Sequence, residues 1–156
     1  MTGMPVTIRE AAKNLAELCV KFCNSVSCYE TVDCVVSMPP SRPDKPFDLP
    51  HFLAGEIASA LGKADLRGSL KTRSKRKQLK GVSVNDKLNQ LRGTVHVDET
   101  VFRGKDVLIV DDLYQSGTSV NYVGMLLLQA GARRVFALAC EKTVGNVDNV
   151  GARGNK

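Results

Sequence analysis

The segment from 107 to 130 constrains the fold more than any other part of the chain. It begins with the apolar run VLIV at 107–110, continues through two aspartates and a turn of small residues, and ends with apolar residues at helical spacing over 119–130. A short continuous apolar run is typical of a strand that is covered on both faces, as in a parallel sheet. A helix that follows such a strand directly is the repeating unit of α/β folds. The segment therefore predicts a central parallel strand with a helix packed against its sheet.

The rest of the chain alternates in the same way. The first expected helix carries apolar residues from Ile8 to Val26, and Thr7 with Glu10 fits a capping box at its start. We expect a second helix with Asp48 as its N-cap and Gly62 after its end. The other expected elements are a strand at 32–38, the second helix at 49–61, a strand at 65–73, a mobile loop with one helical turn at 74–93, a short strand at 93–97 and a strand at 134–140. This order predicts the α/β class, with a mostly parallel central sheet flanked by helices.

Length and composition favour one globular domain. The chain has 156 residues, of which 43% are hydrophobic and 24% are charged, and these values are near globular averages. No run of eighteen apolar residues occurs, so we expect no membrane span. The first residues, MTGMPVTIRE, lack the pattern of a signal peptide, and we expect a cytoplasmic protein.

Positive charge is concentrated in one segment. The chain has 22 Lys and Arg against 16 Asp and Glu, and the segment KTRSKRKQLK at 71–80 contains no acidic residue. Such a patch attracts polyanions, which include nucleic acid, a phosphorylated small molecule and pyrophosphate. It is also the composition of a solvated surface. Charge alone does not choose among these.

The five cysteines do not form a disulfide framework, because their number is odd and four of them lie close together near the start of the chain. Those four are Cys19, Cys23, Cys28 and Cys34, and no pair has the C-x-x-C spacing. Cys19 and Cys23 share one face of the expected first helix. Buried thiols in a helix and a strand are the favoured interpretation, and a zinc site is the alternative.

The acidic pair and the following turn suggest a ligand with two chemically different parts. Asp111 and Asp112 stand at the carboxyl end of the expected strand, where α/β sheets bind ligands. Carboxylates there can accept hydrogen bonds from the paired hydroxyls of a ribose, or hold Mg²⁺ directly or through water. The turn at 114–119 opens a helix, and exposed N–H groups at a helix start favour a phosphate. The alternative is that the aspartates only cap the following helix. No G-x-x-x-x-G-K-[ST] motif is present, which argues against a P-loop protein.

The stretch VLIVDDLYQSGTS at 107–119 resembles the signature of type I phosphoribosyltransferases for phosphoribosyl pyrophosphate (PRPP). The stretches at 78–81 and 89–93 resemble, more narrowly, the ComF-type branch associated with competence. Together these similarities cover about residues 32–142. The resemblance implies a single phosphoribosyltransferase-like domain over 1–143, with an N-terminal helix in 1–30, a flexible basic loop at 71–93 and a disordered tail at 144–156. The zinc ribbon of many ComF-type proteins is not evident.

The resemblance implies a role for each matching position. The catalytic residues would be Asp111 and Asp112, which hold the ribose hydroxyls and the metal, together with Arg76. The PRPP site would also include Gln115, Ser116, Gly117, Thr118 and Ser119, which bind the 5′-phosphate. The pyrophosphate loop would contain Ser37, Pro40, Ser41 and Arg42, and the flexible loop Arg73, Lys75, Arg76, Lys77 and Gln78. A mobile cationic loop can exclude water from the sugar cation that forms during transfer.

One departure separates the chain from the members that act on 6-oxopurines. Those members carry an acid that serves as a base where this chain has Gln115, and an amide cannot take that proton. Little sequence follows the strand at 134–140, so the hood, the lobe that covers the nucleobase in the family, is expected to be reduced. The resemblance implies a Mg²⁺-dependent enzyme with an undetermined acceptor, and many relatives are homodimers. A non-catalytic PRPP or nucleotide sensor, a ComF-like accessory protein of DNA uptake and a nucleic-acid-binding module stay open as alternatives.

Overall fold

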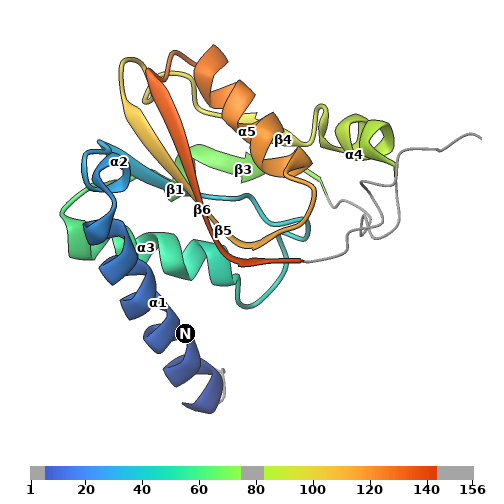
Figure 1. Cartoon of the computed structure of the whole chain (residues 1–156). Coiled ribbons are helices and arrows are strands. Elements are labelled where there is room, and N and C mark those ends of the chain that lie inside the picture. The colour runs from blue at the N-terminus through green and yellow to red at the C-terminus, as the bar shows by residue number, and fades with distance from the viewer. Residues whose placement is uncertain (1–5, 75–82, 144–156) are drawn as a thin grey trace, which may run out of the picture.

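The computed structural model describes residues 6–74 and 83–143 and contains two sheets. The main sheet has four parallel strands in the order β2-β1-β5-β6 (Figure 1). These strands are β1 Cys34–Ser37, β2 Ala64–Asp65, β5 Asp106–Tyr114 and β6 Arg134–Lys142. A smaller antiparallel sheet pairs β3 Leu70–Thr72 with β4 Val95–Val97. The predicted α/β class with a parallel central sheet is confirmed.

Helices cover both faces of the main sheet, as Figure 1 shows. The helices are α1 Val6–Ser25, α2 Ser27–Glu30, α3 Leu49–Leu61, α4 Val84–Leu91 and α5 Thr118–Gln129, with a 3-10 turn η1 at Arg67–Ser69. One core cluster joins α1 and α3 to the sheet, and a second joins α5 to the opposite face. Alternate residues of β1 serve the two clusters, since Val35 belongs to the first and Val36 to the second. Within the described part of the chain, no helix has the length and apolar character needed to cross a bilayer.

The helix α3 begins and ends where the sequence predicts. The Asp48 carboxylate accepts a hydrogen bond from the His51 backbone N–H at 3.1 Å, which satisfies one of the free amides at the helix start. Gly62 closes the helix with a φ of 63°, a left-handed conformation that glycine adopts without steric cost.

Several predicted features differ from the structure. Thr7 lies within α1, which is already helical at Val6, so Thr7 is not its N-cap. The expected strand at 65–73 is divided into β2, the 3-10 turn and β3. Part of the expected loop at 74–93 is the helix α4, where the Ser83 hydroxyl accepts a hydrogen bond from the Asp86 backbone N–H at 3.2 Å and Leu91 is buried. The expected tail at 144–156 and most of the basic segment lie outside the described residues.

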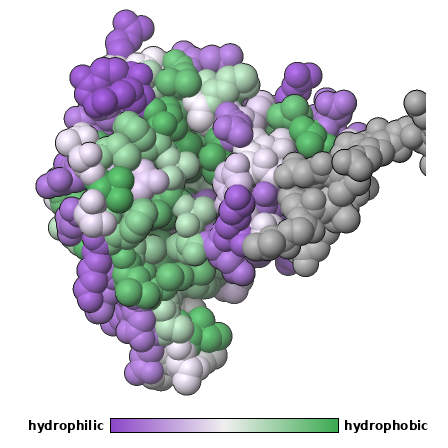
Figure 2. Space-filling view, in the orientation of Figure 1, coloured by the Kyte–Doolittle hydropathy of each residue, from purple (hydrophilic) through white to green (hydrophobic). Residues whose placement is uncertain are grey.

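The strand β6 forms one edge of the main sheet, and its outer side is partly covered by aromatic residues. The Tyr29 hydroxyl donates a hydrogen bond of 2.7 Å to the Ala137 carbonyl, and the Tyr29 ring contacts both Phe22 and Phe136. Figure 2 shows that much of the face carrying this strand is apolar. The large exposed apolar side chains of the flanking helices include Leu18 on α1 and Leu128 on α5.

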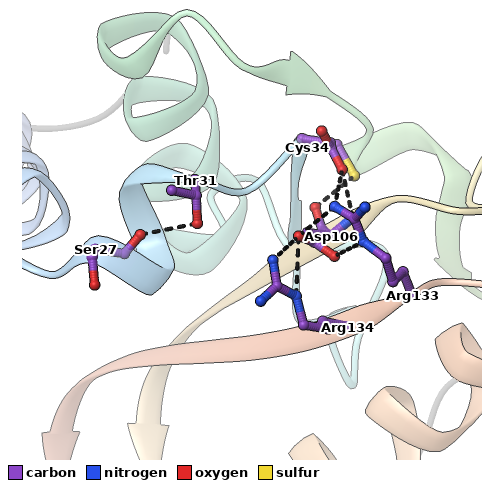
Figure 3. A network of polar contacts seen from close by, with 7 residues as sticks. Ser27, Thr31, Cys34, Asp106, Arg133 and Arg134 are labelled. Carbon is purple, nitrogen blue, oxygen red and sulfur yellow. Dashed lines mark hydrogen bonds and ion pairs between the residues drawn. The ribbon is translucent and has the colours of Figure 1, made fainter.

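The amino ends of β5 and β6 are held together by a buried carboxylate. The Asp106 side chain is 1% exposed and accepts hydrogen bonds of 2.5–3.1 Å from the guanidinium groups of Arg133 and Arg134. Figure 3 shows both guanidinium groups pointing at this carboxylate. The two arginines hold the pKa of Asp106 far below its usual range. This cluster lies at the end of β5 opposite to Asp111 and Asp112.

We expect the substitution Asp106→Asn to destabilise the fold more than a typical surface substitution. The neutral amide loses charge-assisted hydrogen bonds to both Arg133 and Arg134. Because the folded-state pKa of Asp106 is depressed, its stabilisation is present above the ordinary aspartate pKa near about 4 and declines as the pH falls below that value. In urea unfolding, the midpoint concentration of Asp106→Asn should therefore lie below that of wild type at neutral pH, and this difference should become smaller in acid. Asp98→Asn is the matched control, because the Asp98 carboxylate accepts its hydrogen bonds from the nearby Thr100 and is not bound by a guanidinium among the described residues. A gap that does not change with pH would contradict this role.

Candidate active site

A cavity of about 300 Å³ opens at the carboxyl ends of β1 and β5. This is the edge where ligands bind in parallel α/β sheets. Three segments supply most of its wall: the loop after β1, the start of α3 and the continuous stretch from the end of β5 into α5. The lining residues are Met38, Pro39, Pro40, Ser41, Lys45, Asp48, Pro50, Lys87 and all residues from Asp111 to Val120.

Asp111 and Asp112 both line the cavity, although β5 continues through them to Tyr114. The sequence placed the end of this strand at Val110. Adjacent strand residues point to opposite faces, but the Asp111 carboxylate turns back and accepts a hydrogen bond from the Asp112 backbone N–H at 2.9 Å. Burial and the nearby Asp112 charge raise the pKa of Asp111 to about 7. The site therefore concentrates negative charge where it is poorly solvated, and a cation would relieve that repulsion.

The turn after β5 forms the other end of the cavity. Gly117 is the N-cap of α5 and has a φ of 74°, so the backbone is in the left-handed region at this point. The hydroxyls of Ser116 and Thr118 are 2.9 Å apart. The first amides of a helix have no partner within the helix, and together with the helix dipole they attract anions. All five residues predicted to bind the phosphate, Gln115 to Ser119, line the cavity.

The predicted pyrophosphate loop is only partly in the cavity wall. Pro40 and Ser41 line the cavity, and the Pro40 carbonyl is held by the Thr72 hydroxyl at 2.6 Å. Ser37 is buried at the end of β1, and Arg42 is exposed and outside the lining. Lys45, three residues later, is the cationic residue that this loop brings to the cavity. The lysine was missed because the loop has no regular structure from which a side-chain direction could be predicted.

Of the five residues predicted for the flexible loop, only Arg73 lies in the part of the chain that the structure describes. The Arg73 backbone N–H donates to the Thr94 carbonyl at 2.7 Å, and its guanidinium lies 2.7 Å from Nδ1 of His96. Arg73 thus lies directly after β3, beside the small sheet, and does not line the cavity. Lys75, Arg76, Lys77 and Gln78 lie outside the described residues.

Two further charged residues of the cavity were not predicted. Lys87 of α4 is only 4% exposed and lines the cavity. The pattern Ser83-x-x-Asp86 is a helix-start signal that could have identified α4. Asp48 was predicted only as a helix cap, and it lies in the cavity wall as well. Burial is the largest cause that raises the pKa of Asp48, and the charge of Asp112 adds to it.

The donor set at this cavity fits Mg²⁺ better than a resident structural metal. Within the described residues, no group of three or more His, Cys, Asp and Glu side chains is arranged to hold a metal ion. Mg²⁺ is often held by one or two carboxylates with the substrate phosphates and water completing its shell. Asp111 and Asp112 offer such a pair, since both line the cavity.

This combination of fold and cavity defines a parallel α/β protein with a candidate ligand site at the carboxyl edge of its main sheet. The family of the phosphoribosyl transferase domain matches residues 52–146, more than half of the chain. The chain belongs to this family. The resemblance that the stretch at 107–119 indicated is thereby confirmed at the level of the family, and the ComF-type branch stays a prediction.

Similar proteins include larger enzymes of which this chain matches only a part. The chain is 28% identical over 107 residues to the amidophosphoribosyltransferase of Saccharomyces cerevisiae, covering 69% of this chain and 19% of that protein. The glutamine PRPP amidotransferase from B. subtilis, solved with ADP and GMP, has a TM-score of 0.58 at 21% identity. The alignment covers 84% of this chain and 26% of that one. An adenine phosphoribosyltransferase from Thermoanaerobacter pseudethanolicus has a TM-score of 0.53 at 14% identity, with 86% and 82% covered. These structures share the fold.

Proposed function

We propose that this chain binds PRPP in the cavity after β1 and β5 and transfers its phosphoribosyl group to an acceptor, with release of pyrophosphate. The observation that carries the proposal is the placement of two carboxylates and a helix-start turn in one cavity. PRPP also has two chemically different parts. Its ribose diol can bind the two carboxylates, and its 5′-phosphate can bind the helix-start turn. The family match supports the same ligand.

In this proposal, different residues of the cavity bind different parts of PRPP. The turn from Gln115 to Ser119 binds the 5′-phosphate, and the carboxylates of Asp111 and Asp112 accept hydrogen bonds from the ribose hydroxyls. Lys45 and Lys87 place positive charge in the wall, where it stabilises the departing pyrophosphate. Mg²⁺, when bound, supplies further neutralisation of the pyrophosphate. The two aspartates also stabilise the positive charge that develops on the sugar as the bond to pyrophosphate breaks.

Gln115 limits the kind of acceptor. Its amide lines the cavity but cannot act as a base. We therefore propose that the acceptor is a nucleophile that does not need to give a proton to residue 115. The non-catalytic alternative, a PRPP sensor, uses the same contacts without transfer.

Titration calorimetry with PRPP tests the binding step. Wild-type protein should bind PRPP more tightly with Mg²⁺ than without it, and the double substitution Asp111→Asn/Asp112→Asn should remove the Mg²⁺-dependent part. Glu99→Gln is the matched control, because Glu99 is an exposed carboxylate outside the cavity. Equal binding by wild type and the double variant would show that the cavity is wrongly assigned. Pyrophosphate release with a panel of acceptors then separates an enzyme from a sensor, since a sensor binds PRPP without releasing pyrophosphate.

A further inference from the structure

Two thiols from opposite ends of the chain meet in the core beside β6. The Sγ atoms of Cys19 in α1 and Cys140 in β6 are 3.6 Å apart, although the residues are 121 positions apart in sequence. We propose that Cys19 and Cys140 form a reversible intramolecular disulfide when the protein meets a hydroperoxide. The family match says nothing of this pair, and the proposal does not depend on the function of the cavity.

The geometry of the pair suits a disulfide. A disulfide has an S–S distance of about 2.05 Å, so the two sulfur atoms need to approach by only about 1.5 Å. Cys19 is 6% exposed in the core cluster that joins α1 and α3 to the sheet. Cys140 packs against the same cluster and is half-buried on the edge strand. Cys140 is therefore the more exposed of the two thiols.

Reactivity within the pair is unequal. The hydrogen bond with Cys140 lowers the pKa of Cys19 to about 7, which favours its thiolate form. The thiolate is the nucleophilic form. The same contact, together with burial, raises the pKa of Cys140. Cys19 is therefore the attacking thiol, and Cys140 is the resolving thiol.

The reaction is balanced with one peroxide and two thiols. The Cys19 thiolate attacks one oxygen of hydrogen peroxide, the O–O bond breaks, and hydroxide leaves, so that Cys19 becomes a sulfenic acid. The Cys140 sulfur then attacks the Cys19 sulfur, the S–O bond breaks, and the oxygen leaves as water after taking a proton. Two thiols and one peroxide thus give one disulfide and two molecules of water. A dithiol reductant restores both thiols by two successive exchanges.

The other cysteines lack this arrangement. Burial raises the pKa of Cys23 and of Cys34 to about 11, which keeps both as inert thiols at neutral pH. All five cysteines lie in the described part of the chain, and Cys19 with Cys140 is the one thiol pair within hydrogen-bonding distance there. The disulfide would join α1 to the strand that lies next to Asp111, because Ala139 and Glu141 pair with Asp111 and Leu113.

Peptide mapping of the full chain tests the proposal directly. Trypsin cuts after Lys and Arg, which places Cys19 in the peptide 14–21 and Cys140 in the peptide 135–142, each with no second cysteine. After titration with hydrogen peroxide and digestion without reductant, we expect most of these two peptides in a single linked species, which dithiothreitol separates. Cys34→Ser is the matched control and should give the same linked species.

Substitution of the resolving thiol gives an independent readout. In Cys140→Ser we expect Cys19 to stop at sulfenic acid, which dimedone traps on the peptide 14–21, whereas wild type should give little adduct. In Cys19→Ser the linked species should be absent and Cys140 should stay unmodified. The proposal is overturned if wild type under excess peroxide leaves both peptides unlinked, or if Cys19 is linked instead to the peptide that carries Cys23, Cys28 and Cys34. Equal dimedone labelling of wild type and Cys140→Ser would also overturn it.

Discussion

Replacing Gly117 with alanine is expected to weaken PRPP binding roughly tenfold or more. Gly117 has a φ of 74°, and this conformation costs an L-residue about 1–2 kcal/mol. A Cβ atom at this position would also lie 2.8 Å from Cζ of Tyr114 and nearer still to its hydroxyl, so the ring would have to move. Each 1.4 kcal/mol lost in binding is about a factor of ten. The turn would relax in the free variant and would have to return to the strained form to present its amides to the phosphate.

Two variants separate the causes of this effect. Gly68→Ala is the matched control, because Gly68 has no atom within 4 Å of the added carbon and no positive φ. It should bind PRPP as wild type does in calorimetry. Combining Gly117→Ala with Tyr114→Ala removes the clash and leaves only the backbone cost. Gly117→Ala should therefore lower the affinity for PRPP less in the Tyr114→Ala background than in the wild-type background. Unchanged affinity in Gly117→Ala would mean that this turn does not hold the phosphate.

Local chemistry explains the features that the sequence predicted correctly. The bounds of α3 followed from Asp48 and Gly62, because a side-chain cap and a left-handed glycine act within a few residues of the helix end. The stretch from Asp111 to Ser119 is continuous in sequence, so a strand, a turn and a helix start bring all of its residues to one cavity. Such features need only short-range information.

The features that sequence reasoning missed depend on distant packing. Lys87 reaches the cavity because α4 packs near α5, and neither its sequence neighbours nor its charge predicts a buried position. Cys19 and Cys140 meet across 121 residues, so their contact follows from the position of α1 beside the edge strand. Asp106 is neutralised by Arg133 at the far end of β5, where the sequence showed only an acid in a turn. The strand β5 also extends beyond its apolar run, because its pairing with β6 continues through Tyr114.

The substitution Asp111→Asn is expected to stabilise the free protein above neutral pH. Asp111 has a folded-state pKa of about 7 against an ordinary value of 3.8, so the folded protein holds a proton that the unfolded chain has lost between these values. Stability therefore falls as the pH rises through this window, and the full cost of the buried charge is present above about pH 7. Asparagine is uncharged at every pH and avoids this cost, which is no more than about 4 kcal/mol.

Thermal unfolding at two pH values measures this cost. At about pH 8 the melting temperature of Asp111→Asn should exceed that of wild type, and at about pH 4 the two should nearly agree, because Asp111 is then protonated in the folded protein. Asp112→Asn is the matched comparison. It removes the neighbouring charge that raises the pKa of Asp111 but leaves the burial, so its gain at high pH should be smaller. A difference that is the same at both pH values would come from packing and not from the charge. A pH-dependent gain would mean that the free protein keeps a destabilising carboxylate where a substrate with its cation makes that charge useful.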